Sequence, residues 1–286
     1  MVAWSLASWS WEPGVLVGLF SLVTAYVIGL RRFRPETLWQ EQNVSIRELV
    51  CFGLGVALLV VALVSPLDTL SNQMFSVHMV QHMLLVYVVP PLLLAGMPSW
   101  LTRPLLSIPS IQKVWTVCVS FVPATIIFNG ILVAWHLPTL WDYALIDPMV
   151  HALEHVAFLF AGIVVWWPIY SQSQDVPRLR YPSQMLFLFV QSLVPAIIGA
   201  FITFSAIVVY PVYLETPKLW GLTPIADQQI AGLVMKMLGM VYLWILFTIK
   251  FFQWFTHEEH ENEKLIDDGP IRSAIGEGVP PLDRQA

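Results

Sequence analysis

Five histidines of this chain stand in short patterns whose spacing suits metal coordination. His78 and His82 form the run HMVQH, and His151 and His155 form the run HALEH, so each pair is spaced i,i+4. In a helix this spacing places both imidazoles on one face, about one turn apart. His136 lies in a third run, AWHLP. Ligating groups are costly to bury in apolar helices and mark function by default, so these runs indicate a metal-handling protein.

Copper is the metal that this set of side chains favours. Imidazole binds zinc, copper and iron, whereas thioether sulfur selects soft Cu(I). Met79 and Met83 lie beside the first histidine pair, and the two cysteines, Cys51 and Cys118, lack CxxC spacing. A mixed His/Met set without cysteine suits copper in an oxidising compartment. The predicted ligands are His78, His82, His136, His151, His155, Met79 and Met83.

Carboxylates near these runs are candidates for the groups that orient the ligands. Metal-bound imidazoles usually hydrogen-bond to a carboxylate or carbonyl, and Glu154, Asp68 and Asp227 are the acids predicted for this role. Lys236 lies at a depth similar to that of Glu154 in its own predicted span. Because a buried ammonium without a partner is costly, we expect Lys236 and Glu154 to share a contact or a hydrogen-bond network.

Other interpretations of the same residues stay open. Histidines at helix ends often only form hydrogen bonds, methionines often fill a core, and His136 can serve as a loop anchor. The run HALEH also spells H-x-x-E-H, in which His151 and His155 would bind zinc and Glu154 would act as the general base of a hydrolase. Such an enzyme needs a third protein ligand. Histidines on two facing helices can also bind haem as axial ligands.

Composition identifies an integral membrane protein. The chain has 286 residues, of which 57% are hydrophobic and 12% charged, and its mean hydropathy is +0.70. Soluble domains carry about 25% charged residues. The start of the chain has no basic region of the kind that opens a cleavable signal peptide. A net charge of −5 gives no reason to expect nucleic acid as a partner; the expected surroundings are membrane lipid.

An all-α fold with seven transmembrane helices follows from the apolar segments. A hydrocarbon core of about 30 Å requires about 20 apolar residues in a helix. The seven predicted spans are residues 14–30, 45–64, 74–95, 113–134, 149–167, 184–210 and 230–252. Pro90 and Pro91 should bend or break the third span, and Pro195 should tilt or kink the sixth.

Positive charge predicts the orientation of the spans. Twelve of the fourteen basic residues fall in the connectors after spans one, three and five or towards the C-terminus. The positive-inside rule then places the N-terminus outside and the C-terminus in the cytoplasm. With this topology the five histidines lie at the outer ends of their spans, whereas His257 and His260 lie on the cytoplasmic side.

Two regions are expected, a transmembrane domain at residues 1–255 and a cytoplasmic tail at residues 256–286. The tail has eight acidic and three basic residues and little apolar content. Such a composition is typical of a disordered, solvated segment. We expect His257 and His260 to be part of this acidic tail and not of the metal site.

The chain resembles the CtaG family of cytochrome c oxidase assembly factors, the polytopic type linked to caa-type oxidases. The resemblance lies in four runs, HMVQHMLLVYVVPPLLLAGMP, AWHLPTLWDYAL, VHALEHVAFLFAGIVVWWPI and ADQQIAGLVMK, and covers about residues 40–255. The histidines of the family match His78, His82, His136, His151 and His155, and Glu154 and Asp227 fall within the matched runs.

The resemblance implies a non-enzymatic assembly factor in the bacterial plasma (inner) membrane. It implies supply or insertion of copper into the oxidase at the outer face, with oxidase subunits and a copper chaperone as partners. The alternatives are a metal-free scaffold for oxidase subunits and an intramembrane zinc hydrolase that uses His151, Glu154 and His155. Zinc and haem rank behind copper as cofactors.

Overall fold

The computed structural model describes residues 8–33, 44–216 and 219–268, with side chains as far as Glu261, and within these ranges the chain is helical and contains no strand. The predicted all-α fold is confirmed. The long elements are α1 (Pro13–Arg32), α2 (Ile46–Leu63), α8 (Phe121–Trp135), α10 (Pro148–Tyr170), α11 (Tyr181–Phe204) and α13 (Gly239–Asp268). The shorter ones are α3 (Pro66–Ser71), α4 (Phe75–Met83), η1 (Leu84–Val88), α5 (Val89–Ala95), α6 (Arg103–Leu106), α7 (Pro109–Cys118), α9 (Pro138–Ile146), η2 (Pro211–Leu214), η3 (Leu219–Gly221), α12 (Pro224–Leu233) and η4 (Val234–Leu238).

Among the described residues, six helices are long and apolar enough to cross a membrane, and a seventh span results if α7 and α8 are counted together. The predicted fourth span is therefore not one straight helix, because α7 and α8 meet at an angle of 70°. Pro123 explains the break. It has no N–H for the carbonyl of Val119, which disfavours a helix that continues from α7, whereas proline is tolerated in the first turn of a new helix.

The third predicted span is continuous, and its proline pair is accommodated by a π-helical turn. The segment η1 lies directly before Pro90 and Pro91. Proline at position 90 leaves the carbonyl of Val86 without its helical donor. The indole Nε1 of Trp166 donates a hydrogen bond to that carbonyl at 2.6 Å. Gly162 lets α10 come this close, since a Cβ there would lie 2.5 Å from Pro90.

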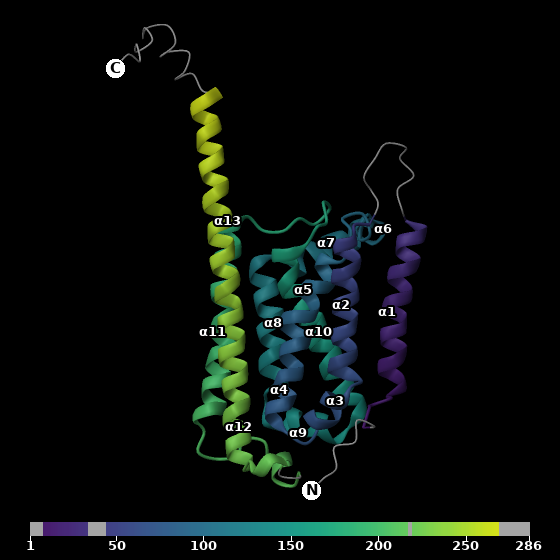
Figure 1. Cartoon of the computed structure of the whole chain (residues 1–286), viewed down its shortest axis with the longest axis vertical. Helices are drawn as coiled ribbons and strands as arrows, with labels where there is room; N and C mark the ends of the chain where they lie inside the picture. The colour runs from purple at the N-terminus through teal and green to yellow at the C-terminus, as the bar shows by residue number, and fades with distance from the viewer. Residues whose placement is uncertain (1–7, 34–43, 217–218, 269–286) are drawn as a thin grey trace, which may run out of the picture.

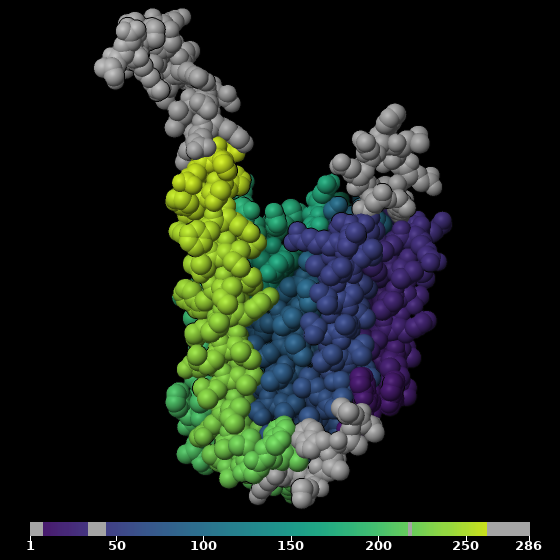
Figure 2. Space-filling model, in the orientation of Figure 1, coloured from purple at the N-terminus to yellow at the C-terminus, as the bar shows by residue number. Residues whose placement is uncertain are grey.

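The helices form a bundle in which α4 and α10 lie inside and α1 lies at the edge (Figure 1). α4 packs against α3 and α12, and α10 packs against α8, α9, η1 and α5. α1 is attached to α2 through Tyr26, whose ring stacks on Phe52 at 3.5 Å and whose hydroxyl donates to the carbonyl of Gly96 at 2.9 Å. Most of α1 forms an outer surface of the molecule (Figure 2).

The last predicted spans differ from the structure at their ends. α11 ends at Phe204, before the predicted end at residue 210, and it continues through Pro195. α12, η4 and α13 together extend from Pro224, and α13 projects beyond the bundle to Asp268 (Figure 1). The beginning of the tail, residues 256–268, is thus helical and not disordered as predicted. A helix that has already formed adds further residues readily. The rest of the tail lies outside the described residues.

The two ends of the bundle have different characters. α3, α9 and the first turns of α4, α10 and α12 lie at the end of the bundle where α1 begins, which we call the histidine end (Figure 1). The last turn of α1, with Arg31 and Arg32, and the beginnings of α2 and α11 lie at the opposite end. This opposite end is the one that the charge pattern predicts to face the cytoplasm.

Candidate metal site

The two histidine pairs meet between α4 and α10. Within each helix the paired rings are close, with centroids 4.2 Å apart for His78 and His82 and 4.3 Å apart for His151 and His155. Across the interface, the centroids of His78 and His151 are 5.5 Å apart, and those of His82 and His155 are 5.9 Å apart. The structure therefore brings four of the five predicted histidines into one cluster.

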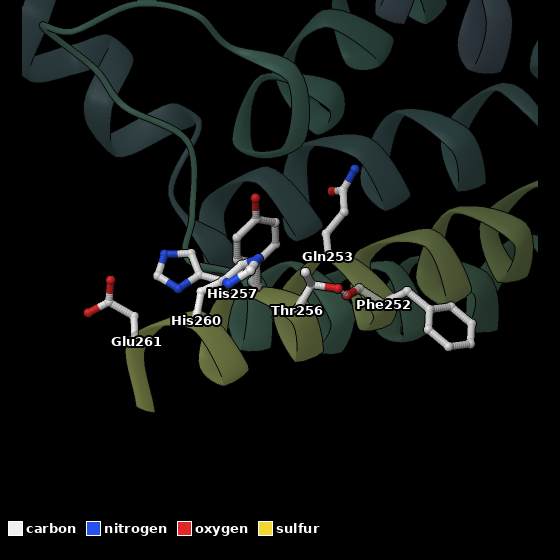
Figure 3. A pocket seen from close by; sticks show the side chains of 7 residues that line it. Phe252, Gln253, Thr256, His257, His260 and Glu261 are labelled. Atoms are coloured by element: carbon white, nitrogen blue, oxygen red, sulfur yellow. Dashed lines mark hydrogen bonds between the residues drawn. The ribbon is translucent and has the colours of Figure 1, made fainter. Parts of the chain in front are cut away.

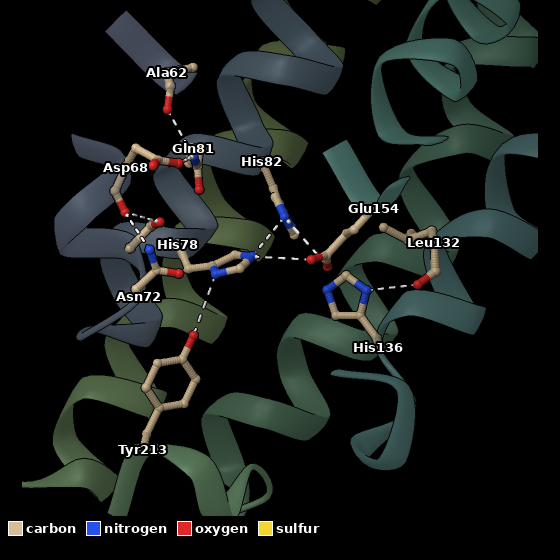
Figure 4. Close-up of polar contacts among 11 residues, drawn as sticks. Ala62, Asp68, Asn72, His78, Gln81, His82, Leu132, His136, Glu154 and Tyr213 are labelled. Atoms are coloured by element: carbon tan, nitrogen blue, oxygen red, sulfur yellow. Dashed lines mark hydrogen bonds and ion pairs between the residues drawn. The ribbon is translucent and has the colours of Figure 1, made fainter. Parts of the chain in front are cut away.

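Glu154 extends from α10 towards the imidazoles of α4 (Figure 4). Its Oε1 lies 3.6 Å from Nε2 of His82, and its Oε2 lies 3.9 Å from Nε2 of His78. The two Nε2 atoms of His78 and His82 are 2.8 Å apart. Glu154 was predicted to orient a ligand from outside, but here the carboxylate is at the centre of the cluster.

Several polar atoms of the cluster are buried without a hydrogen-bond partner among the described residues. They are both carboxylate oxygens of Glu154, Nδ1 of His82 and the Nε2 atoms of His151 and His155. A buried polar atom that lacks a partner is unfavourable, and a buried carboxylate is especially so. A cation that contacts these oxygens and nitrogens would remove that cost.

Two sets of potential ligand atoms are compact enough to hold an ion. The first consists of His78, His82 and His155, and the second of His78, His151 and Glu154, with the ligand atoms of each set within 4.8 Å of one another. Nitrogen with a single carboxylate is a donor set that suits zinc and copper. Since His78 belongs to both sets, an ion could exchange ligands across the cluster without leaving it.

Asp227 holds the helix that carries His78 and His82. Its carboxylate, from the first turn of α12, accepts hydrogen bonds from the backbone N–H of Phe75 at 2.7 Å and of Ser76 at 3.2 Å, and from the Ser76 hydroxyl. These N–H groups open α4 and have no partner inside the helix, and the helix dipole favours a negative charge there. Asp227 therefore positions α4 and does not hydrogen-bond to an imidazole.

Asp68 contributes through Gln81, a residue that the sequence analysis did not single out. The Gln81 amide donates to Asp68 Oδ1 at 2.9 Å and to the carbonyl of Ala62 at 2.8 Å. Burial raises the pKa of Asp68 above its usual value, and the hydrogen bond from Gln81 opposes this shift. Gln81 lies in α4 between the two histidines and ties this helix to α2 and α3. Its position within HMVQH was the only signal in the sequence.

His136 lies beside the cluster but is not part of either compact set. Its Nδ1 contacts the carbonyl of Leu132 at 2.7 Å, and its ring centroid is 5.6 Å from that of Trp141. Burial lowers the pKa of His136 to about 4. Met79 and Met83 line a small cavity together with His82 and His136.

Two aromatic residues that the sequence analysis did not assign to the site lie beside the cluster: Trp141, which falls within the run AWHLPTLWDYAL, and Tyr213. The Trp141 ring lies 4.6 Å from that of His78, between centroids. The Tyr213 hydroxyl is 3.5 Å from Nδ1 of His78 (Figure 4). Both come from segments outside the spans, where a single aromatic residue gives no sequence signal for a neighbour so distant in the chain.

The predicted contact between Lys236 and Glu154 is wrong. Lys236 lies over the ring of Phe204, with Nζ 5.6 Å from the ring centroid. The π-helical segment η4 turns it towards α11, where a Cβ on Gly199 would lie 3.0 Å from the Cβ of Lys236. Phe204 thus provides a cation–π partner in place of a carboxylate.

His257 and His260 are far from the cluster, on the part of α13 beyond the opposite end. They line an open hollow of about 600 Å³ with Tyr181 and Glu261 (Figure 3). The sequence analysis kept these two histidines apart from the metal site, and the structure does the same.

Comparison with known proteins identifies relatives. The chain is 27% identical over 241 residues to an uncharacterized protein of Mycobacterium tuberculosis and to one of Mycobacterium bovis, and 27% identical over 243 residues to one of Mycobacterium leprae. These alignments cover 78% of this chain but 36% of each relative, so the chain spans about a third of the length of the proteins it matches. No solved structure gives a significant match.

The match to a family is more extensive. Residues 24–257 match the family described as cytochrome c oxidase caa3 assembly factor, Caa3_CtaG. This range contains every residue of the histidine cluster together with Asp68, Asp227 and Lys236. The chain therefore belongs to the Caa3_CtaG family of cytochrome c oxidase caa3 assembly factors.

Proposed function

We propose that this protein binds copper between α4 and α10 and helps to deliver it to a cytochrome c oxidase during assembly. The observation that carries the proposal is the buried Glu154 carboxylate, which has no hydrogen-bond partner among the described residues and lies within 4 Å of Nε2 of His78 and His82. The copper is cargo, and the protein acts as a carrier without catalysis.

The arrangement of ligands supports transfer better than permanent storage. His78 is common to both compact sets of ligand atoms, and His151 is only half buried. An ion held by an incomplete or exchangeable set can leave by stepwise replacement of its ligands. The partners in this proposal are oxidase subunits that accept copper and a copper chaperone that supplies it.

The orientation proposed here has the histidine end outside a bacterial plasma membrane. The arginines at the end of α1 and before α11 support it, since basic residues are favoured on the cytoplasmic side. The cluster would then open towards the compartment in which the copper centres of the oxidase receive their metal.

Elemental analysis of the full chain in detergent tests copper binding. The wild type, loaded aerobically with Cu(II) without chelators, is compared with His78→Ala/His82→Ala and with His151→Ala/His155→Ala. The matched control is His257→Ala/His260→Ala, which removes a histidine pair from the hollow on α13. We expect near-stoichiometric copper in the wild type and the control and its loss in both cluster variants. Copper that is retained in both cluster variants would contradict the proposal.

A zinc hydrolase is the second candidate, because His78 belongs to one compact set with His155 and to another with His151. In that case His78 provides the third ligand that the H-x-x-E-H pattern lacks. The two functions differ in the role of Glu154, which contacts the ion in the copper carrier and acts as the base of turnover in the hydrolase. Zinc in the purified protein, with peptidase activity abolished by Glu154→Gln, would favour hydrolysis. A metal-free scaffold predicts instead that the cluster variants still support oxidase assembly in cells.

A further inference from the structure

A cavity of about 20 Å³ lies next to the histidine cluster, and its walls include the ring of His136 and three methionine side chains, Met79, Met83 and Met235. We propose that this cavity is a second metal subsite, selective for Cu(I), formed by Nε2 of His136 and these thioethers. The inference rests on the proposed function, since it assumes that the protein handles copper, and it adds a site of different chemistry.

The tautomer of His136 is the first argument. Its Nδ1 lies 2.7 Å from the carbonyl oxygen of Leu132, which can only accept a hydrogen bond. Nδ1 therefore carries the hydrogen, and Nε2 of the neutral ring carries a lone pair. This Nε2 is buried and has no hydrogen-bond partner among the described residues. A hydrogen bond from one ring nitrogen to a backbone carbonyl is how proteins orient an imidazole whose other nitrogen binds a metal.

The thioethers are the second argument. Met79 and Met83 are one turn apart on α4, and Met235 comes from η4. Both Met79 and Met235 are buried. Methionines commonly fill cores, but here they line a space next to an unpartnered imidazole nitrogen. Sulfur ligands of this type select Cu(I) over harder ions.

The size of the cavity is the third argument. A space of about 20 Å³ exceeds the roughly 10–15 Å³ that one water molecule requires, so a single ion fits. Two π-helical segments adjoin residues that line the cavity: η1 starts directly after Met83, and η4 contains Met235. Single π-helical turns often occur at functional sites.

His82 connects the two subsites. Its Nε2 faces His78 and Glu154, whereas its Nδ1 is buried without a hydrogen-bond partner among the described residues and its ring lines the cavity. A copper ion would thus have nitrogen and carboxylate ligands in the cluster and sulfur and nitrogen ligands in the cavity. Movement between them requires only exchange of ligands, and the ion stays Cu(I).

X-ray absorption spectroscopy of the full chain tests this subsite. The protein is loaded anaerobically with one equivalent of Cu(I) under ascorbate, and its affinity is measured by competition with a Cu(I) chelator. We expect copper–sulfur scattering in the wild type. Met235→Leu should reduce that scattering and weaken Cu(I) binding by at least about tenfold, while zinc binding at the histidine cluster is unchanged. Leucine conserves the volume of methionine, so the fold should persist.

Met237→Leu is the matched control, because Met237 lies on the same π-helical segment and is 49% exposed. Copper coordinated by nitrogen and oxygen alone, with no effect of Met235→Leu, would overturn the inference while leaving copper binding at the cluster intact. Copper–sulfur scattering that persists after His151→Ala/His155→Ala would support the second subsite even if the cluster binds no copper. No copper in the wild type would overturn both.

Discussion

Oε1 of Glu154 in α10 lies 3.6 Å from Nε2 of His82 in α4. This contact crosses the interface between the two helices that carry the histidine pairs, and it places a carboxylate in a buried, largely apolar setting. The same carboxylate that makes the cluster a good site for a cation also destabilises the protein when no cation is present.

Replacement of Glu154 by methionine should therefore stabilise the metal-free protein and weaken metal binding. Exchange of a buried charged group for an apolar one of similar volume is often neutral or stabilising by about 1–4 kcal/mol. Thermal unfolding of the metal-free protein and metal stoichiometry are the two measurements. Leu153→Met, at an exposed position of the same helix, should change neither. A lower unfolding temperature for Glu154→Met would show that the carboxylate has a partner that stabilises it.

Asp227→Ala should loosen α4 and reduce metal binding without removing any ligand. The carboxylate accepts bonds from two backbone N–H groups at the start of α4 and is 7% exposed, so its loss should cost roughly 2–3 kcal/mol. Asp147 caps the start of α10 in the same way, since it accepts hydrogen bonds from N–H groups in the first turn of that helix, but it is less buried. Asp147→Ala should therefore cost only about 1 kcal/mol. Denaturant unfolding in detergent compares the two; equal effects would mean that burial of Asp227 is unimportant.

The close contact between α11 and α12 should not tolerate a larger side chain. A Cβ at Gly232 would lie 2.6 Å from the carbonyl oxygen of Gly199 and 2.7 Å from the backbone nitrogen of Thr203. Gly232→Ala should therefore separate the helices and destabilise the protein by about 1–3 kcal/mol. Gly130→Ala, where nothing lies within 4 Å, should be neutral or slightly stabilising. Unfolding temperatures that fall equally in both variants would disagree with this packing.

Asp68 should make stability depend on pH. Its pKa is raised above the usual 3.8 by burial, so the native state favours the protonated carboxyl. Its contribution to stability is present below pH 3.8 and is lost as pH rises through the native pKa. Asp68→Asn keeps an acceptor for Gln81 and removes the charge. We expect the unfolding temperature of this variant, relative to the wild type, to increase with pH; a difference that is constant across pH would reject this role of Asp68.

The C-terminus should lie in the cytoplasm. The ends of α1 and α13 and the start of α11 share one end of the bundle (Figure 1). That end carries the basic residues at the end of α1, which are favoured on the cytoplasmic side. Green fluorescent protein fused after residue 286 should fluoresce, since it folds poorly when exported unfolded, and alkaline phosphatase at the same position should be inactive. The opposite pair of results would invert the topology and place the histidine cluster on the cytoplasmic side.

Local sequence determined much of this protein. Hydrophobic length predicted the spans, and i,i+4 spacing put His78 with His82 and His151 with His155, because a helix repeats every 3.6 residues. The charge pattern placed both pairs at the same end of the bundle. These properties depend on neighbours along the chain, so they can be read without knowledge of the packing.

Tertiary structure decided how the side chains meet. It placed Glu154 among the imidazoles and the Asp227 carboxylate at the start of α4. It also placed Lys236 over the ring of Phe204 and Met235 in the wall of the cavity beside His136. Each outcome depends on the rotation of a helix about its axis and on which helix lies beside it. Those quantities are set by close packing between distant segments and by π-helical turns such as η4, which periodicity alone does not predict.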